Sequence, residues 1–117
     1  MENSYNFEKY QILDKISVGN KSLILFESYP SKNCKFDEIY GAKVFLFDKN
    51  MNFIWQIEKV IGCTNIASGK FEVGENKSAY IRIAAKDRKY TAENFQGDIF
   101  EIDLENGKTT HLGWGKN

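Results

Sequence analysis

The sequence predicts an all-β protein, an antiparallel sandwich or partly open barrel of about eight short strands built from hairpins. Several segments alternate hydrophobic and polar residues with period two, and turn-forming residues separate them. Aromatic residues, which favour strands, make up 15% of the chain. No segment shows a helical stripe. A length of 117 residues predicts a single β domain over residues 1–117.

The first half of the chain contains two expected hairpins. Gly-Asn at 19–20 offers a two-residue turn, and the run at 23–26 is apolar on both faces. Such a run predicts a central strand covered on both sides. In the second hairpin, Phe53, Trp55 and Ile57 are expected to share one face. The expected strands here are 10–18, 21–29, 39–48 and 53–60, with a loop at 30–37.

The second half is expected to hold a short strand at 71–73 and a longer one at 78–86, between irregular segments at 61–70 and 87–96. Alternation in the longer strand predicts one inward and one outward set of side chains. The inward set is Ala79, Ile81, Ile83 and Ala85, and the outward set is Tyr80, Arg82, Ala84 and Lys86.

The segment 97–112 is the clearest hairpin. Phe100, Ile102 and Leu104 alternate with polar or exposed positions, which predicts a strand with one buried face. The pair Asn106-Gly107 supplies the positive φ angles of a tight turn, so the chain should return along 109–112.

Charge is balanced overall but unevenly distributed. The chain has 16 basic and 16 acidic residues, which argues against a general nucleic-acid binder. Residues 76–90 hold five cations and one anion, a net of +4, whereas 91–117 hold two cations and five anions, a net of −3. The two segments either neutralise each other on neighbouring strands or present separate patches to a partner.

The sequence contains no pattern for secretion or for crossing a membrane, and this bears on the state of its two cysteines. The first residues lack the basic and apolar regions of a secretory signal, and no apolar run approaches the ~20 residues that span a bilayer. We therefore expect a cytoplasmic protein in which Cys34 and Cys63, both placed in loops, stay reduced.

Motifs for catalysis or metal binding are incomplete. His111 is the only histidine; it fits either a dyad with Cys63 or an ordinary polar position on a terminal strand, and no nucleophile elbow favours the dyad. Asp48-x-Asn50-x-Asn52 begins like a calcium loop, but Phe53 and Lys59 stand where the pattern needs glycine and glutamate. Turn formation explains these residues better. We expect no enzyme activity, no cofactor and no metal.

Two features suit a macromolecular partner. One is an outward acidic row, Glu101, Asp103 and Glu105, with Glu93 and Asp98 nearby; the other is Trp114, which lies between glycines near the end of the chain. The alternatives are that the acidic row only keeps a sheet edge soluble and that Trp114 folds back over the core.

Residues 41–108 resemble a family of small bacterial proteins associated with toxin immunity, including contact-dependent growth inhibition and related polymorphic toxin systems. The matching segments are 44–57, 63–66 and 97–108. Three positions depart from the family pattern: Met51 replaces a turn glycine, Cys63 replaces a tyrosine, and Phe95 stands where tryptophan is common.

The resemblance implies a non-enzymatic immunity protein that binds and neutralises a cognate toxin domain in the cytoplasm, as a monomer or 1:1 complex. Direct binding of nucleic acid or membrane is not implied. Many such toxins are nucleases with basic clefts, which a carboxylate row would enter in place of phosphates. The residues assigned to partner binding on this hypothesis are Glu93, Asp98, Glu101, Asp103 and Glu105, with Tyr90 or Trp114 as aromatic anchor.

Two other functions fit the same strands. A small-ligand or carbohydrate-binding β module would use outward Trp55, Tyr80, Tyr90 or Trp114 as a stacking platform. A structural subunit would instead pair with other chains through exposed strand edges.

Overall fold

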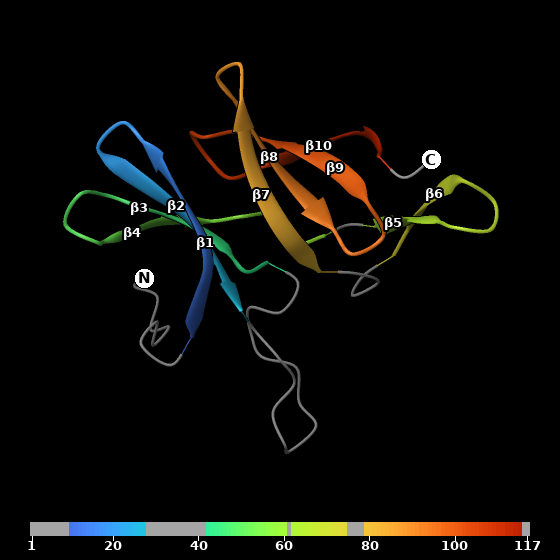
Figure 1. Cartoon of the computed structure of the whole chain (residues 1–117), viewed down its shortest axis with the longest axis horizontal. Coiled ribbons are helices and arrows are strands. Elements are labelled where there is room, and N and C mark those ends of the chain that lie inside the picture. The colour runs from blue at the N-terminus through green and yellow to red at the C-terminus, as the bar shows by residue number, and fades with distance from the viewer. Residues whose placement is uncertain (1–9, 28–41, 61, 75–78, 116–117) are drawn as a thin grey trace.

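The protein is all-β, as the sequence predicts (Figure 1). The structure, a computed structural model, describes residues 10–27, 42–60, 62–74 and 79–115. Within these residues it contains ten antiparallel strands in three sheets and no helix, and the sheets do not close into a barrel. The strands are β1 (Gln11–Val18), β2 (Lys21–Glu27), β3 (Val44–Phe47), β4 (Phe53–Gln56), β5 (Gly62–Asn65), β6 (Lys70–Val73), β7 (Tyr80–Lys86), β8 (Lys89–Asn94), β9 (Asp98–Ile102) and β10 (Thr109–Trp114).

Two of these strands replace segments that the sequence predicts to be irregular. β5 lies in the segment 61–70, so Cys63 is a buried strand residue rather than a loop residue. Gly62 lets β6 approach closely, because a Cβ there would lie 2.3 Å from the Glu72 carbonyl oxygen. β8 lies in the segment 87–96; its buried side chains are the small Ala92 and the polar Asn94, so no hydrophobic alternation marks it.

The first sheet has the order β1-β2-β3-β4 and is buried on both faces of its two central strands. The run at 23–26 is fully covered, as predicted. One face joins the main core through Leu23, Leu25, Val44 and Leu46. The other face forms a second cluster of Tyr10, Ile24, Phe26, Phe45 and Phe47, with Phe53 packed against it.

A bulge in β4 separates Phe53 from the residues expected to share its face. Leu46 pairs with Trp55 and Phe47 with Phe53, so Ile54 is an extra residue in the ladder. Trp55 and Ile57 therefore enter the main core, whereas Phe53 packs on Phe45 with ring centroids 5.5 Å apart.

The second sheet has the order β10-β9-β8-β7 and buries only one face. A bulge at Ile81 reverses the expected start of β7: Tyr80 is fully buried and Ile81 is 39% exposed. The Tyr80 hydroxyl donates to the Glu58 carbonyl oxygen at 3.1 Å, and burial raises the pKa of the phenol. Ala79 and Ile83 face inward and Arg82 faces outward as predicted, but Ala85 is exposed.

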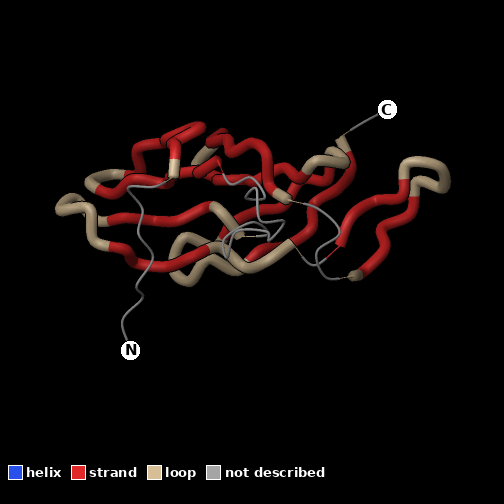
Figure 2. Tube along the Cα trace, turned by 90° about the horizontal axis from the view of Figure 1, so that it is seen from below, coloured by secondary structure: helices blue, strands red, loops and turns tan. Residues whose placement is uncertain are grey.

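The two four-stranded sheets share the main core, which makes the architecture a sandwich. Tyr80, Ile83 and Phe100 of the second sheet belong to the same buried cluster as the inward residues of the first. The Trp55 indole also donates to the Leu104 carbonyl oxygen at 2.8 Å. Figure 2 shows the β5–β6 hairpin projecting beside these sheets at one end of the molecule.

The final hairpin forms where expected, but its turn is longer than a two-residue Asn-Gly turn. Of the pair Asn106-Gly107, only Gly107 has a positive φ, 79°. The chain leaves β9 at Ile102 and re-enters the sheet at Thr109, after amide groups of Asn106 and Gly107 donate to the Asp103 carbonyl oxygen. Glycine is needed for packing, since a Cβ at Gly107 would lie 2.7 Å from the Trp55 ring.

The expected loop at 30–37 and Cys34 lie outside the described residues. In the part of the chain that the structure describes, no helix is long and apolar enough to cross a membrane.

Candidate partner-binding surface

The acidic row expected on one strand is divided between a strand and a turn. Glu101 lies on the outward face of β9 and is half-buried. Asp103 and Glu105 are exposed in the turn after that strand, where the Asp103 carboxylate accepts the Glu105 amide at 2.9 Å. The row is thus shorter than predicted, although all three carboxylates reach the surface at this end of the second sheet.

Glu93 lies on the outward face of β8 and has a neighbour of opposite charge. Its carboxylate meets Arg82 of β7 at 2.8 Å. The Arg82 side chain is 60% exposed, so the ion pair is screened and stabilises the fold only slightly. Glu93 consequently adds less negative potential to the surface than a free carboxylate would.

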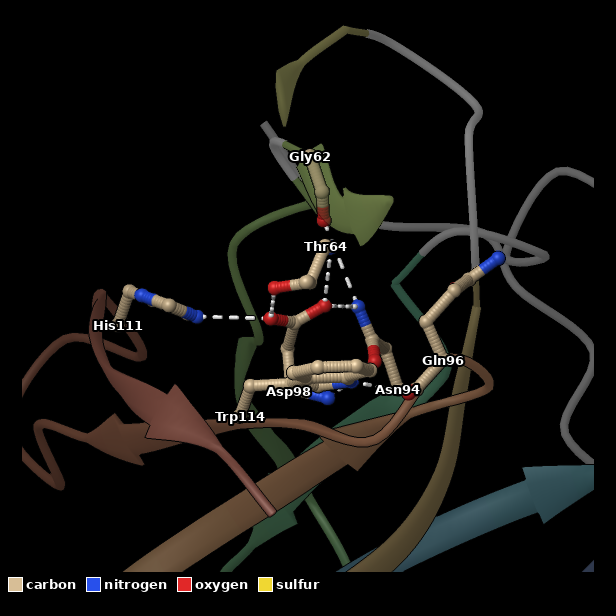
Figure 3. Close-up of polar contacts among 7 residues, drawn as sticks. All are labelled: Gly62, Thr64, Asn94, Gln96, Asp98, His111 and Trp114. Carbon is tan, nitrogen blue, oxygen red and sulfur yellow. Dashed lines mark hydrogen bonds and ion pairs between the residues drawn. The ribbon is translucent and has the colours of Figure 1, made fainter. Parts of the chain in front are cut away.

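Asp98 was expected to widen the acidic patch, and that prediction is wrong. The residue is fully buried, on the same face of β9 as Phe100 and Ile102. Figure 3 shows its carboxylate among Thr64, Asn94 and His111. The Thr64 amide donates at 2.7 Å, Asn94 Nδ2 donates at 3.0 Å, His111 Nε2 lies at 2.9 Å, and the Thr64 hydroxyl also donates.

This buried carboxylate joins four strands, because its partners come from β5, β8 and β10. Burial raises the pKa of Asp98, but the hydrogen bonds from Thr64, His111 and Asn94 outweigh it and hold the pKa below its ordinary value. His111 also stacks on Phe71 of β6, with ring centroids 4.2 Å apart. His111 therefore anchors the β5–β6 hairpin to the second sheet, a structural role that the sequence left open.

Trp114 is docked rather than free. Its indole nitrogen donates to the Gln96 carbonyl oxygen at 2.7 Å, and its ring is half-buried (Figure 3). This geometry matches the alternative in which the side chain folds back on the domain.

The outward aromatic platform expected for a carbohydrate module does not form as predicted. Tyr80 is fully buried and Trp55 is 7% exposed. Tyr90 stands at the start of β8, whereas Trp114 bonds Gln96 beyond the end of that strand. The two remaining aromatic residues are thus at opposite ends of the sheet.

The predicted residues Tyr90, Glu101 and Asp103 meet in one open hollow of about 440 Å³. Arg88 and Lys89, which the sequence did not single out for binding, line it as well. The remaining lining residues are Ile102, Leu104 and Thr110. Of the seven residues assigned to partner binding, the structure brings these three together.

The hollow forms because two neighbouring strands diverge. Thr91 pairs with Glu101, and beyond that pair β8 continues with β7 alone while β9 continues with β10. In Figure 1 the β7–β8 turn and the β9–β10 turn point in different directions. We call the space between Lys89–Tyr90 and Ile102–Leu104 the fork.

The turn above the fork has a strained backbone. Asp87 and Arg88 have φ angles of 54° and 66°, as in a type I′ turn, where glycine is usual at the second position. Arginine is disfavoured there, so Arg88 reaches the fork at a conformational cost.

Metal-ion and calcium motifs gain no support within the described residues, which contain no group of three or more His, Cys, Asp or Glu placed to hold a metal. Asp48 forms a turn instead: its carboxylate accepts the amides of Asn50 and Asn52 at 2.8 and 2.9 Å. The Asn52 amide is the main cause that lowers the pKa of Asp48.

Comparison of the chain with protein-family models, with curated proteins and with solved structures finds no match.

Proposed function

We propose that this protein is a cytoplasmic, non-enzymatic inhibitor that binds a cognate protein toxin domain at the fork and the adjoining β9–β10 turn. The fork itself carries the proposal, because it brings Tyr90, Glu101 and Asp103 to one solvent-open surface. The resemblance of residues 41–108 to toxin-immunity proteins supplies the class of partner.

The surface offers a partner both charge and contact area. Glu101 borders the fork, and Asp103 and Glu105 extend the carboxylates onto the exposed turn. Carboxylates at a rim mainly accelerate association and align the partner. Tyr90 is half-buried beside them and supplies the aromatic surface that is typical of an energetic centre in interfaces.

The proposal predicts that a gene beside the one for this chain encodes a toxin domain. The test is co-expression of that domain with this protein, together with a measured affinity. We expect the protein to protect cells and to form a 1:1 complex. The variant Glu101→Lys/Glu105→Lys should weaken binding at least tenfold, because two attractions become repulsions. Asp103 is left intact because it caps the turn.

The matched control is Asp14→Lys/Glu72→Lys, with the same change in charge at exposed positions on β1 and β6. Affinity should stay within about twofold of the wild type, since neither residue lines the fork. Equal losses in both variants would show a nonspecific charge effect and overturn the assignment of the surface. Absence of any complex with the encoded toxin domain would refute the function.

A further inference from the structure

We propose that the fork is a binding site for a zwitterion of the arginine type, a ligand with a guanidinium group and a carboxylate on one short chain. The ligand would occupy the same fork as the proposed toxin surface, but the inference does not rest on the toxin, because it concerns binding to the isolated protein.

The first observation is the arrangement of charge around the fork. Arg88 in the β7–β8 turn and Lys89 at the start of β8 line the hollow from one side. Glu101 of β9 and Asp103 of the turn after it line it from the other. Within the described residues none of these four side chains forms a salt bridge, unlike Arg82 and Glu93 farther along the sheet. A ligand of one sign would be attracted by one pair and repelled by the other. A ligand that carries both signs satisfies both pairs.

The second observation is the lining between the charges. Tyr90 and Leu104 line the hollow and are only partly buried, because they pack against the core cluster. Aliphatic carbons of a short chain can pack on such a lining, and a guanidinium group favours the face of a tyrosine ring. The cation of the ligand is therefore assigned to Tyr90, Glu101 and Asp103.

The anion of the ligand is assigned to the other side of the fork. The Arg88 guanidinium can pair with the ligand carboxylate through two parallel hydrogen bonds, and Lys89 adds a second cation. Arg88 occupies its position despite a φ of 66°, which glycine would adopt without strain. Strained residues gather at ligand sites, so the backbone gives a separate reason to assign Arg88 to binding.

The size of the hollow suits a compact ligand. Its volume of about 440 Å³ lies in the range of small-molecule sites. The site is open to solvent and its ion pairs are screened, so we expect a dissociation constant on the order of 1 mM.

The test is a titration of the isotope-labelled full-length protein, followed by amide chemical shifts at matched ionic strength. The probes are L-arginine, agmatine, which lacks the carboxylate, and glutarate, which lacks the cation. L-Arginine should saturate shifts at residues 88–91 and 101–104. Agmatine should bind about tenfold more weakly, because it loses the carboxylate and leaves its ammonium group facing Arg88 and Lys89 without that carboxylate beside it. Glutarate should also bind about tenfold more weakly, because it loses the guanidinium group and presents a second carboxylate to Glu101 and Asp103.

N-Acetyl-L-arginine distinguishes the two sources of this chemistry. Binding equal to that of L-arginine would show that a C-terminal arginine residue of a protein chain is sufficient for binding. Binding at least fivefold weaker identifies the free amino acid, whose α-ammonium group is then also recognised. Both results support the site.

Lys89→Gln should weaken L-arginine binding about fivefold without weakening agmatine binding, because Lys89 contacts only the anion. Lys86→Gln is the control: Lys86 pairs with Lys89 across the same hairpin but does not line the fork. Agmatine that binds as tightly as L-arginine, equal effects of the two variants, or no saturable shifts at the fork would each overturn the proposal. The spectra also report whether each variant is folded.

Discussion

The two four-stranded sheets have the same meander topology but differ in how many faces they bury. The first packs one face on the shared core and the other into the second cluster, which contains Ile24, Phe26 and Phe45. The second packs only its inner face, and Glu93 and Glu101 stand on the outer one. We infer that the first sheet contributes more to stability. The outer face of the second sheet remains available for charged and partner-binding side chains.

The largest expected effect tests this division directly. Ile24→Ala should lower the free energy of unfolding by about 3–4 kcal/mol, because Ile24 is fully buried in the second cluster. Ile81→Ala makes the same change on the second sheet, where Ile81 is 39% exposed, and should cost less than about 1 kcal/mol. Urea unfolding measures both. Similar losses of stability in the two variants would show that the outer faces of both sheets contribute equally to stability, which would contradict the assigned difference between the sheets.

Asp98 is the point where the second sheet depends on a polar core. Asp98→Asn should cost about 2–3 kcal/mol near neutral pH, because it removes a buried charge that holds Thr64 and His111 and sets an amide group against their donors. Asp103→Asn, at an exposed turn, is the control and should cost under about 1 kcal/mol.

The cost of Asp98→Asn should depend on pH with a definite sign. The folded-state pKa of Asp98 lies below its ordinary value of 3.8, so the carboxylate stabilises the fold at higher pH and loses this contribution as pH falls through the folded pKa. The difference between wild type and variant should therefore shrink in unfolding measurements between pH 7 and pH 2. A difference independent of pH would show that the charge of Asp98 is not what holds the hairpin.

Period-two alternation along the sequence was enough to predict the strands that have an apolar inner row. At bulges it predicted the wrong inward face. Each ladder irregularity leaves one extra residue, and in all four described cases that residue is an exposed leucine or isoleucine. These are Leu13, Ile54, Ile81 and Leu112. A hydrophobic side chain in a bulge looks like a core residue in the sequence, so the phase of β7 was read incorrectly.

The candidate site was predictable only in part for related reasons. The period-two rule that places Phe100 and Ile102 inward also places Asp98 inward, so its burial was available from the sequence and was missed. The fork was not available, because it depends on where β8 leaves β9. No local pattern marks β8, whose inward positions include Asn94, so Arg88 and Lys89 could not be placed opposite Glu101.

The smallest effects compare two strained turns, one in each sheet. Met51, between β3 and β4, and Arg88, between β7 and β8, have φ angles of 63° and 66°. Met51→Gly and Arg88→Gly should each raise the free energy of unfolding by about 0.5–1 kcal/mol, because relief of strain exceeds the added freedom of the unfolded chain. Urea midpoints provide the measurement.

The two variants should differ in binding. Met51 does not line the fork, so Met51→Gly should stabilise the protein and leave affinity for L-arginine unchanged. Arg88→Gly should stabilise the protein and weaken that affinity about fivefold, because it removes one of the two cations facing the ligand carboxylate. Lower stability in Arg88→Gly would show that its side chain supports the fold, and the strain could then no longer be attributed to the site. If Arg88→Gly stabilises the protein and weakens binding while Met51→Gly only stabilises it, the strained backbone at Arg88 is retained in the second sheet for binding.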